Sequence, residues 1–232
     1  MKHRCKLIDW GLKMKNERCY GKLSWSVDDK DDYLTFANSK DANLWGMKYY
    51  ENWAKQYKKI MYTSESVIKE SLCSIPIECY CGYSYQQINK FMRDKKDDES
   101  NTYRELSDIL AIVLASAPRI PQNVVLYRMV SDKFIQTLIE KNRQSTPIKE
   151  NGFMSTSLIK SIASENESYA NEENLLRIFV PKDTIGVYVN AVTERSEEEM
   201  LLFPNMYLAL IAYPYHDEET GKRVFECKLI EI

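Results

Sequence analysis

The sequence predicts an α+β fold in which an N-terminal helical lobe precedes a mixed or antiparallel β-sandwich core. Up to about residue 120, apolar residues recur at the spacing of amphipathic helices. After Pro121 the pattern changes to short runs rich in β-branched and aromatic residues, which is typical of strands. Helices grouped ahead of strands, instead of alternating with them, indicate the α+β class. We therefore expect one domain over 33–232, with the helical lobe at about 33–120 and the β core at about 121–232.

Residues 1–32 precede that domain as a leader whose role is open. The first 22 residues are rich in lysine and arginine, so the leader either contacts an acidic surface or is a solvated arm, and we favour the arm. The stretch 7–14 is a poor signal peptide because Asp9 and Lys13 interrupt it. If the protein is exported, we expect its signal to have been removed or replaced.

The composition excludes several classes of protein. The chain has 232 residues, of which 44% are hydrophobic and 12% aromatic, and this is enough to build a sizeable core. The net charge of −2 gives no general attraction to nucleic acid or to a membrane surface. No run approaches the ~20 apolar residues that a membrane-spanning helix needs. We therefore expect no nucleic-acid partner and no stable membrane insertion.

The helical lobe is expected to contain four helices. The first covers 39–58 and begins at Ser39, a residue type that caps helix N-termini. Aromatic residues recur along it every four positions and are expected to pack in the core: Trp45, Tyr49, Trp53 and Tyr57. The other helices are expected at about 64–72, 83–94 and 102–116.

The β core is expected to begin with a strand at Val124–Val130 and a helix at about 131–142. Six further strands are predicted at Phe153–Leu158, Leu175–Val180, Gly186–Asn190, Met200–Phe203, Tyr207–Ala212 and Val224–Ile230. The last two of these are joined by an acidic, turn-like loop over 216–221.

Cysteine and histidine do not indicate a metal site or a catalytic triad. Three of the six cysteines lie close together, Cys73, Cys79 and Cys81, but their spacing is not that of a zinc site and no histidine is near. We therefore expect free thiols and no metal. The two histidines, His3 and His216, fall in a predicted tail and a predicted loop. Neither of the two common glycine-rich phosphate loops is present, so a bound nucleotide would be held by side chains.

Arg128 lies in or at the end of the apolar strand Val124–Val130. A buried guanidinium is costly unless it is paired. Its five N–H donors fit a pyrophosphate or a carboxylate. When Arg128 is considered alone, a structural ion pair with an acid of the core is an equal alternative.

Two further polar groups lie in or beside predicted strands. Ser155-Thr156-Ser157 is on a strand, so Ser155 and Ser157 are expected to share a face. In extended geometry Glu197 and Glu199 would point to one side, and Glu198 to the other. One carboxylate could stabilise a positive oxocarbenium while the other accepts a proton from a nucleophile. Taken singly, the serines fit any strand face and the glutamates fit a solvated acidic turn.

Taken together, these segments resemble the Arg / Ser-Thr-Ser / Glu-x-Glu pattern of bacterial mono-ADP-ribosyltransferase toxins. The resemblance is greatest to the enzymatic component of actin-modifying binary toxins, and Rho-modifying clostridial exoenzymes are relatives. Tyr80-x4-Tyr85-x2-Ile88-Asn89 resembles the helix that lies over NAD in this family. The strand around Arg177 resembles the one that supplies a second arginine. The similarity covers roughly residues 33–232.

The resemblance implies a role for each matching residue. Arg128 would hold the phosphates of NAD with help from Arg177, and the backbone of Met129 would bond the nicotinamide amide. Ser155 would orient Glu199, which would bond the ribose and stabilise the oxocarbenium. Glu197 would orient and deprotonate the acceptor. Contacts to the nucleotide from the helical side would come from Tyr80, Tyr85 and Asn89.

The implied activity is that of an NAD+–protein-arginine mono-ADP-ribosyltransferase with NAD as co-substrate and no metal, because a glutamate at position 197 accompanies arginine acceptors in this family. We expect a secreted, monomeric toxin or virulence effector that acts in the host-cell cytosol; a cytoplasmic location is the alternative. The expected partners are an acceptor protein, with actin and a small GTPase as candidates, and a separate translocation component. The alternative functions on the same fold are an NAD glycohydrolase and a non-catalytic binding module.

Three features depart from the binary-toxin pattern. No aromatic residue occurs at 192–196, before Glu-x-Glu, and Met129 stands where a second arginine often follows the first. A chain of 232 residues also leaves no room for the additional, catalytically silent copy of the fold that these enzymes carry. The departures leave the identity of the acceptor protein open and bear less on arginine as the acceptor residue.

Overall fold

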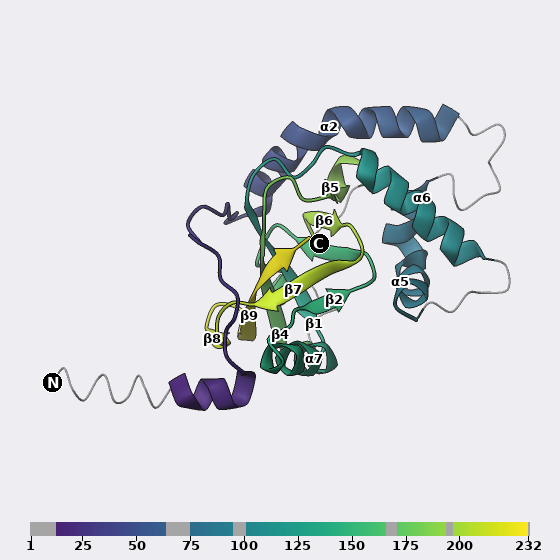
Figure 1. Cartoon of the computed structure of the whole chain (residues 1–232). Coiled ribbons are helices and arrows are strands. Elements are labelled where there is room, and N and C mark those ends of the chain that lie inside the picture. The colour runs from purple at the N-terminus through teal and green to yellow at the C-terminus, as the bar shows by residue number, and fades with distance from the viewer. Residues whose placement is uncertain (1–12, 64–74, 95–100, 166–170, 194–196, 232) are drawn as a thin grey trace.

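The computed structural model describes residues 13–63, 75–94, 101–165, 171–193 and 197–231. It has the predicted α+β class, with helices packed around one large mixed sheet (Figure 1). Within the described residues the sheet has nine strands, in the order β2-β7-β9-β4-β1-β3-β6-β5, and β8 pairs with β9. Neighbouring strands are antiparallel except for β4 and β9, which are parallel.

The strands fall close to their predicted positions. Their bounds are β1 Val124–Val130, β2 Ile148–Glu150, β3 Met154–Ser157, β4 Asn174–Val180, β5 Gly186–Tyr188, β6 Glu199–Leu202, β7 Met206–Leu210, β8 Tyr215–Asp217 and β9 Lys222–Ile230. The short strands β2 and β8 were not predicted. The loop prediction over 216–221 was therefore wrong at its first two residues, which pair with the start of β9. The turn itself is confined to the residues around Gly221, whose positive φ of 67° suits glycine.

Helix α2, Ser39–Thr63, is longer than predicted and packs against β5 and the 3₁₀ turn η4, Val189–Ala191. Its N-cap is Asn38 and not Ser39: the Asn38 carbonyl accepts from Ala42 N, and Asn38 Oδ1 accepts from Asp41 N at 3.0 Å. The side-chain Nδ2 of Asn38 also donates to the Asp41 carboxylate at 3.0 Å.

The aromatic stripe of α2 is only partly in the core. Trp45 and Tyr57 are buried as predicted, whereas Tyr49 and Trp53 are half-buried. A four-residue spacing drifts away from the 3.6-residue period of the helix, so the core face passes to other positions along the helix. The face that is buried consists of Ala42, Trp45, Gly46, Tyr50, Ala54 and Tyr57.

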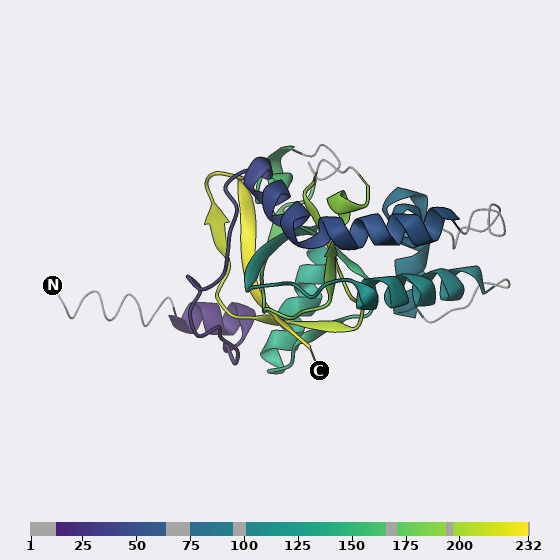
Figure 2. The same ribbon diagram turned by 90° about the horizontal axis from the view of Figure 1, so that it is seen from above.

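The next helical segment is continuous from α4, Pro76–Cys79, through a π-helical turn η2, Tyr80–Ser84, into α5, Tyr85–Asp94. The prediction placed its start at 83 and missed the π turn. It placed another helix at 64–72, a stretch that lies outside the described residues. Helix α6, Thr102–Ser116, is as predicted and packs against α5. Figures 1 and 2 show α5 and α6 together at one end of the molecule.

Two helices support the β core. Helix α7, Asp132–Arg143, follows β1 directly, is capped by Ser131 and packs against β2 and β7. The short helix α8, Ile162–Glu165, was not predicted and packs against β1.

The described part of the leader is not a free arm. Residues 13–20 are helical, and the following turn is tied to α7 because Asn142 Nδ2 donates to the carbonyls of Tyr20 and Lys22. Lys30 pairs with Glu226, and Leu34 forms a bridge to the start of β1. These contacts attach residues 20–34 to the β core, and the domain boundary at 32/33 stays a prediction.

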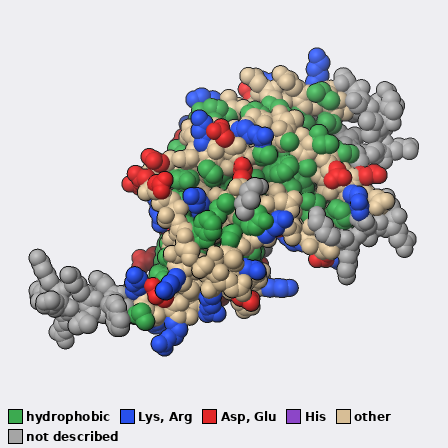
Figure 3. Space-filling model, viewed as in Figure 1, with side chains coloured by type: hydrophobic (Ala, Val, Ile, Leu, Met, Phe, Trp, Pro, Cys, Tyr) green, Lys and Arg blue, Asp and Glu red, His purple; other side chains and the backbone are tan. Residues whose placement is uncertain are grey.

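The surface carries both signs of charge. Figure 3 shows acidic and basic side chains interspersed over one face, in keeping with the net charge of −2. None of the helices described here combines the length and the apolar character needed to cross a membrane.

Replacing Asn38 tests whether this residue is the N-cap of α2. Asn38→Ala should lower the free energy of unfolding by about 1 kcal/mol, because the amide of Asp41 loses its acceptor. Ser39→Ala, the matched control one position later, should change it little. Denaturant unfolding of both variants measures the difference, and a larger loss for Ser39→Ala would contradict the assignment.

Candidate active site

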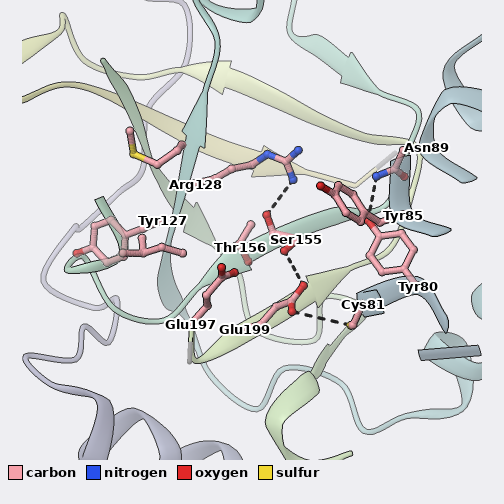
Figure 4. A pocket seen from close by; sticks show the side chains of 12 residues that line it. Tyr80, Cys81, Tyr85, Asn89, Tyr127, Arg128, Ser155, Thr156, Glu197 and Glu199 are labelled. Atoms are coloured by element: carbon pink, nitrogen blue, oxygen red, sulfur yellow. Dashed lines mark hydrogen bonds between the residues drawn. The ribbon is translucent and has the colours of Figure 1, made fainter. Parts of the chain in front are cut away.

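A cleft with a volume of about 400 Å³ opens where β1, β3 and β6 meet the η2–α5 segment (Figure 4). This volume is in the range of small-molecule and cofactor sites. All the site residues predicted from the sequence line it except Arg177: Tyr80, Tyr85, Asn89, Arg128, Met129, Ser155, Glu197 and Glu199. The structure thus gathers residues separated by more than a hundred positions in the chain.

A short chain of hydrogen bonds joins the three neighbouring strands β1, β3 and β6. Arg128 Nη1 donates to the Ser155 carbonyl at 2.8 Å, and Ser155 Oγ donates to Glu199 Oε1 at 2.5 Å. Both bonds follow from the ladder, which pairs Tyr127 with Ser157 and Ser157 with Glu199.

The structural ion pair considered for Arg128 is not found among the residues that the structure describes. Within the described residues no carboxylate pairs with it, and the bond to Ser155 uses one of its five donors. Figure 4 shows its guanidinium reaching over β3 toward the side chains of the helical segment. The remaining donors can therefore serve an anionic ligand in the cleft.

The two outer glutamates reach the same cleft through a turn and not through strand alternation. Strand β6 begins only at Glu199, and Glu198 has a left-handed backbone with φ of 46°. The Glu197 carbonyl accepts from Ser157 Oγ at 2.5 Å, so Ser155 and Ser157 each bond one side of this segment. The Glu198 side chain points elsewhere and accepts from the Tyr188 hydroxyl.

The π-helical turn explains the spacing of the two tyrosines on the helical side. Residues five apart lie on different faces of an α-helix but come together in a π turn. The rings of Tyr80 and Tyr85 are accordingly edge to face, with centroids 6.4 Å apart. Burial raises the pKa of Tyr80 far above its ordinary value, so its hydroxyl stays protonated. Tyr85 is exposed and forms the outer wall of the cleft.

Asn89 ties the helical segment to the sheet. Its Nδ2 donates to the Tyr80 hydroxyl at 2.9 Å and to the Phe153 carbonyl at 3.2 Å, and its Oδ1 accepts from Phe153 N at 2.9 Å. The side chain lines the cleft, but its polar atoms are engaged by protein groups in this structure. Asn89 therefore has a structural role in joining the helical segment to the sheet. Its contact with a nucleotide stays a prediction.

Arg177 lies in a neighbouring cavity and not in the main cleft. The β1–β4 ladder sets Arg177 opposite Tyr127 and Arg128 opposite Leu176, so the two guanidiniums are on opposite faces of the strand pair. Arg177 donates to Glu226 at 2.9 Å. The neighbouring cavity, of about 480 Å³, shares Tyr127 with the cleft. The predicted part of Arg177 in holding phosphates is untested.

Several cleft residues were not predicted. Cys81, treated as an ordinary thiol in the sequence, lies in the π turn with its Sγ 3.9 Å from Glu199 Oε2. Asn190, which does not line the cleft, supports it from behind: its Oδ1 accepts from the Glu199 backbone N–H at 3.3 Å. Tyr127, Thr156 and Ile162 complete the wall.

Cysteines and acidic side chains form no metal centre in the part of the chain described here. None of the four cysteines that the structure describes, Cys19, Cys79, Cys81 and Cys227, is in a disulfide bond.

A model of the ADP-ribosyltransferase exoenzyme family matches residues 42–211, which include every residue of the cleft. The chain belongs to this family. Comparison of the sequence with curated proteins finds no match. Membership therefore rests on the family model, and the fold agrees with it.

Solved structures with a similar fold include ADP-ribosyltransferase toxins. One is BECa, the ADP-ribosylating toxin of a binary enterotoxin of C. perfringens, crystallised with NADH, at a TM-score of 0.67 and 21% identity. The match covers 85% of this chain and 50% of BECa, so the chain spans about half the length of that protein. A second is Plx2a from Paenibacillus larvae, with a TM-score of 0.65 and 17% identity. That match covers 85% of this chain and 100% of Plx2a. A third is the C3 exoenzyme of Clostridium limosum, with a TM-score of 0.61 and 14% identity. That match covers 86% of this chain and 98% of the exoenzyme.

The structural task of Asn89 can be tested by an isosteric change. Asn89→Asp removes the donor to Tyr80 and the Phe153 carbonyl and buries a charge, so the free energy of unfolding should fall by about 1–3 kcal/mol. Gln87→Glu makes the same chemical change at an exposed position of α5 and should have little effect. Denaturant unfolding compares the two, and equal effects would show that the Asn89 bonds contribute nothing.

Proposed function

We propose that the protein is an NAD+–protein-arginine mono-ADP-ribosyltransferase. The observation that carries this proposal is the bonded series Arg128–Ser155–Glu199 in one cleft, with Glu197 beside it. A guanidinium for the phosphates, an oriented carboxylate for the reacting sugar and a second carboxylate for the acceptor are what the reaction needs. Membership of the ADP-ribosyltransferase exoenzyme family supports the same reaction.

The free donors of Arg128 would hold the pyrophosphate of NAD, because a guanidinium fits phosphate oxygens in fork geometry. With Arg128 also bonded to the Ser155 carbonyl, the anchored phosphates would be fixed relative to β3. Tyr80 and Tyr85 would cover the nucleotide from the helical side, where their rings line the cleft. The backbone of Met129 would bond the nicotinamide amide.

Glu199 would stabilise the transition state. The bond between the ribose C1′ and the nicotinamide nitrogen breaks, the electron pair leaves with nicotinamide, and positive charge develops on the ribose. A carboxylate already oriented by Ser155 Oγ stabilises that charge without reorganising. It would also accept a hydrogen bond from the ribose 2′-hydroxyl.

Glu197 would serve the acceptor. An arginine guanidinium is protonated at neutral pH, so a base must remove a proton as its nitrogen attacks C1′. The nitrogen lone pair forms the new bond, and the proton passes to the Glu197 carboxylate. If water attacks instead, the same site acts as an NAD glycohydrolase, which is the second candidate function. A non-catalytic binding module is a third, and the complete set of polar residues in the cleft disfavours it.

We further propose that the protein is a secreted toxin or effector that acts in the host-cell cytosol. Support comes from the similar toxins: BECa belongs to a binary enterotoxin, and Plx2a is an ADP-ribosyltransferase toxin. Actin and a small GTPase are both candidates for the acceptor, and a separate translocation component is a candidate partner.

Mass spectrometry of a host-cell lysate treated with the protein and labelled NAD tests the function. We expect one or a few host proteins to gain ADP-ribose on arginine. Free ADP-ribose without a labelled protein would favour the glycohydrolase, and an absence of nicotinamide release would exclude both enzymes.

Loss of the Glu199 charge should abolish most of the chemistry. Glu199→Gln keeps the size of the side chain but removes its negative charge, so kcat for nicotinamide release should fall at least ~100-fold with little change in the KM for NAD. Glu218→Gln, an exposed position in the β8–β9 turn, is the matched control. An unchanged kcat in Glu199→Gln would remove Glu199 from the mechanism.

Loss of the Glu197 charge should separate transfer from hydrolysis. In Glu197→Gln, Glu199 and Arg128 are intact, so NAD cleavage by water should continue while transfer to arginine stops. Parallel assays of nicotinamide release and of label incorporated into an arginine acceptor measure this ratio. Equal transfer by the variant and the wild type would contradict the role of Glu197.

A further inference from the structure

We propose that Glu198, held by Tyr188 and Asn43, is a positioning residue that sets the orientation of Glu197 for transfer to the acceptor. The proposal rests on the proposed function, since it assigns Glu197 to the acceptor. We call these three residues the Glu198 anchor. Glu198 directly precedes β6, Tyr188 is the last residue of β5, and Asn43 is in helix α2. None of them lines the cleft.

The Glu198 side chain is directed into the protein. Only 7% of the residue is exposed, and its carboxylate accepts from the hydroxyl of Tyr188, which is fully buried. The same hydroxyl accepts from Asn43 Nδ2 at 3.0 Å. A buried carboxylate is costly unless it is hydrogen-bonded, so this contact decides where the side chain lies.

The backbone at Glu198 needs such an anchor. Its φ of 46° is in the left-handed region, which glycine, asparagine and aspartate tolerate better than glutamate. A residue persists in that region only when its surroundings fix it. Tyr188 is itself fixed by α2, because a Cβ on Gly46 would lie 2.3 Å from its ring. The anchor thus connects a rigid helix to the middle of the Glu-x-Glu segment.

The consequence differs for the two outer glutamates. Glu199 has its own supports: the pairing of β6 with β3, the bond from Ser155 Oγ and the contact with Cys81. Glu197 lies before the strand, where Ser157 Oγ holds its carbonyl and the next residue is Glu198. The anchor should therefore matter more for Glu197, and hence for transfer, than for NAD cleavage.

An activity-independent reporter is available at Leu158, whose N–H donates to the Glu198 carbonyl at 3.0 Å. In Tyr188→Phe, amide exchange at Leu158 measured by NMR should speed up. The matched control is Tyr50→Phe. It removes another buried tyrosine hydroxyl, the one that donates from α2 to the carbonyl of Gly186 in β5, and it should leave amide exchange at Leu158 unchanged. Asn43→Ala, a milder change, serves if Tyr188→Phe does not fold.

The functional readout is the ratio of transfer to hydrolysis, with agmatine as a small guanidino acceptor. Tyr188→Phe and Glu198→Ala should each lower kcat for transfer about 10–100-fold, as small misplacements do, while nicotinamide release without acceptor stays near the wild-type rate. The rate of transfer should fall no further in the double variant than in either single variant, because both substitutions break the same contact.

Each outcome bears on one proposal. Unchanged exchange at Leu158, an equal change in Tyr50→Phe, or faster exchange with an unaltered ratio would overturn the Glu198 anchor. If the wild type releases nicotinamide but modifies no guanidino acceptor, the proposed transferase function fails. In that case faster exchange at Leu158 with unchanged nicotinamide release still supports the anchor, and slowed release in the variants overturns it.

Discussion

Antiparallel pairing of β3 with both β1 and β6 is the constraint on which the candidate site depends. It aligns Tyr127, Ser157 and Glu199 across three neighbouring strands. From these positions the Arg128 guanidinium reaches the Ser155 carbonyl, and the Ser155 hydroxyl reaches the Glu199 carboxylate. Because backbone ladders fix this geometry, the charged groups are oriented before any ligand binds, which is the condition under which fixed charges stabilise a transition state best.

The helical lobe supplies the other wall of the cleft and is joined to the sheet by polar contacts. Asn89 uses both ends of its amide on Phe153, at the entry to β3, and also holds the Tyr80 hydroxyl. The π turn then places Tyr80, Cys81 and Tyr85 over the sheet residues. On the other side, α2 reaches Glu198 through Tyr188. The lobe therefore contributes both a wall of the cleft and a support for the glutamate segment.

The sequence predicted the class of fold, the long helices and all the strands with a clear apolar pattern, because burial dictates those patterns locally. The motif in the sequence also predicted that Arg128, Ser155, Glu197 and Glu199 share one site. In the structure these four residues line the same cleft. It could not predict features that depend on tertiary contacts. The π turn, the left-handed Glu198 and the thiol of Cys81 near Glu199 have no local signal. The face on which Arg177 lies depends on the pairing of Arg177 with Tyr127 between β4 and β1. The N-cap of α2 is Asn38, and the sequence offers a second capping residue, Ser39, immediately after it.

The most direct test of the account is a crystal structure of the protein with NAD bound. The account predicts the pyrophosphate within hydrogen-bond distance of the Arg128 guanidinium, and the nicotinamide-side ribose against Glu199 in the cleft between β3 and the π turn. A dinucleotide bound elsewhere on the protein, or a cleft that excludes it while Arg128, Ser155 and Glu199 keep their present bonds, would contradict the account.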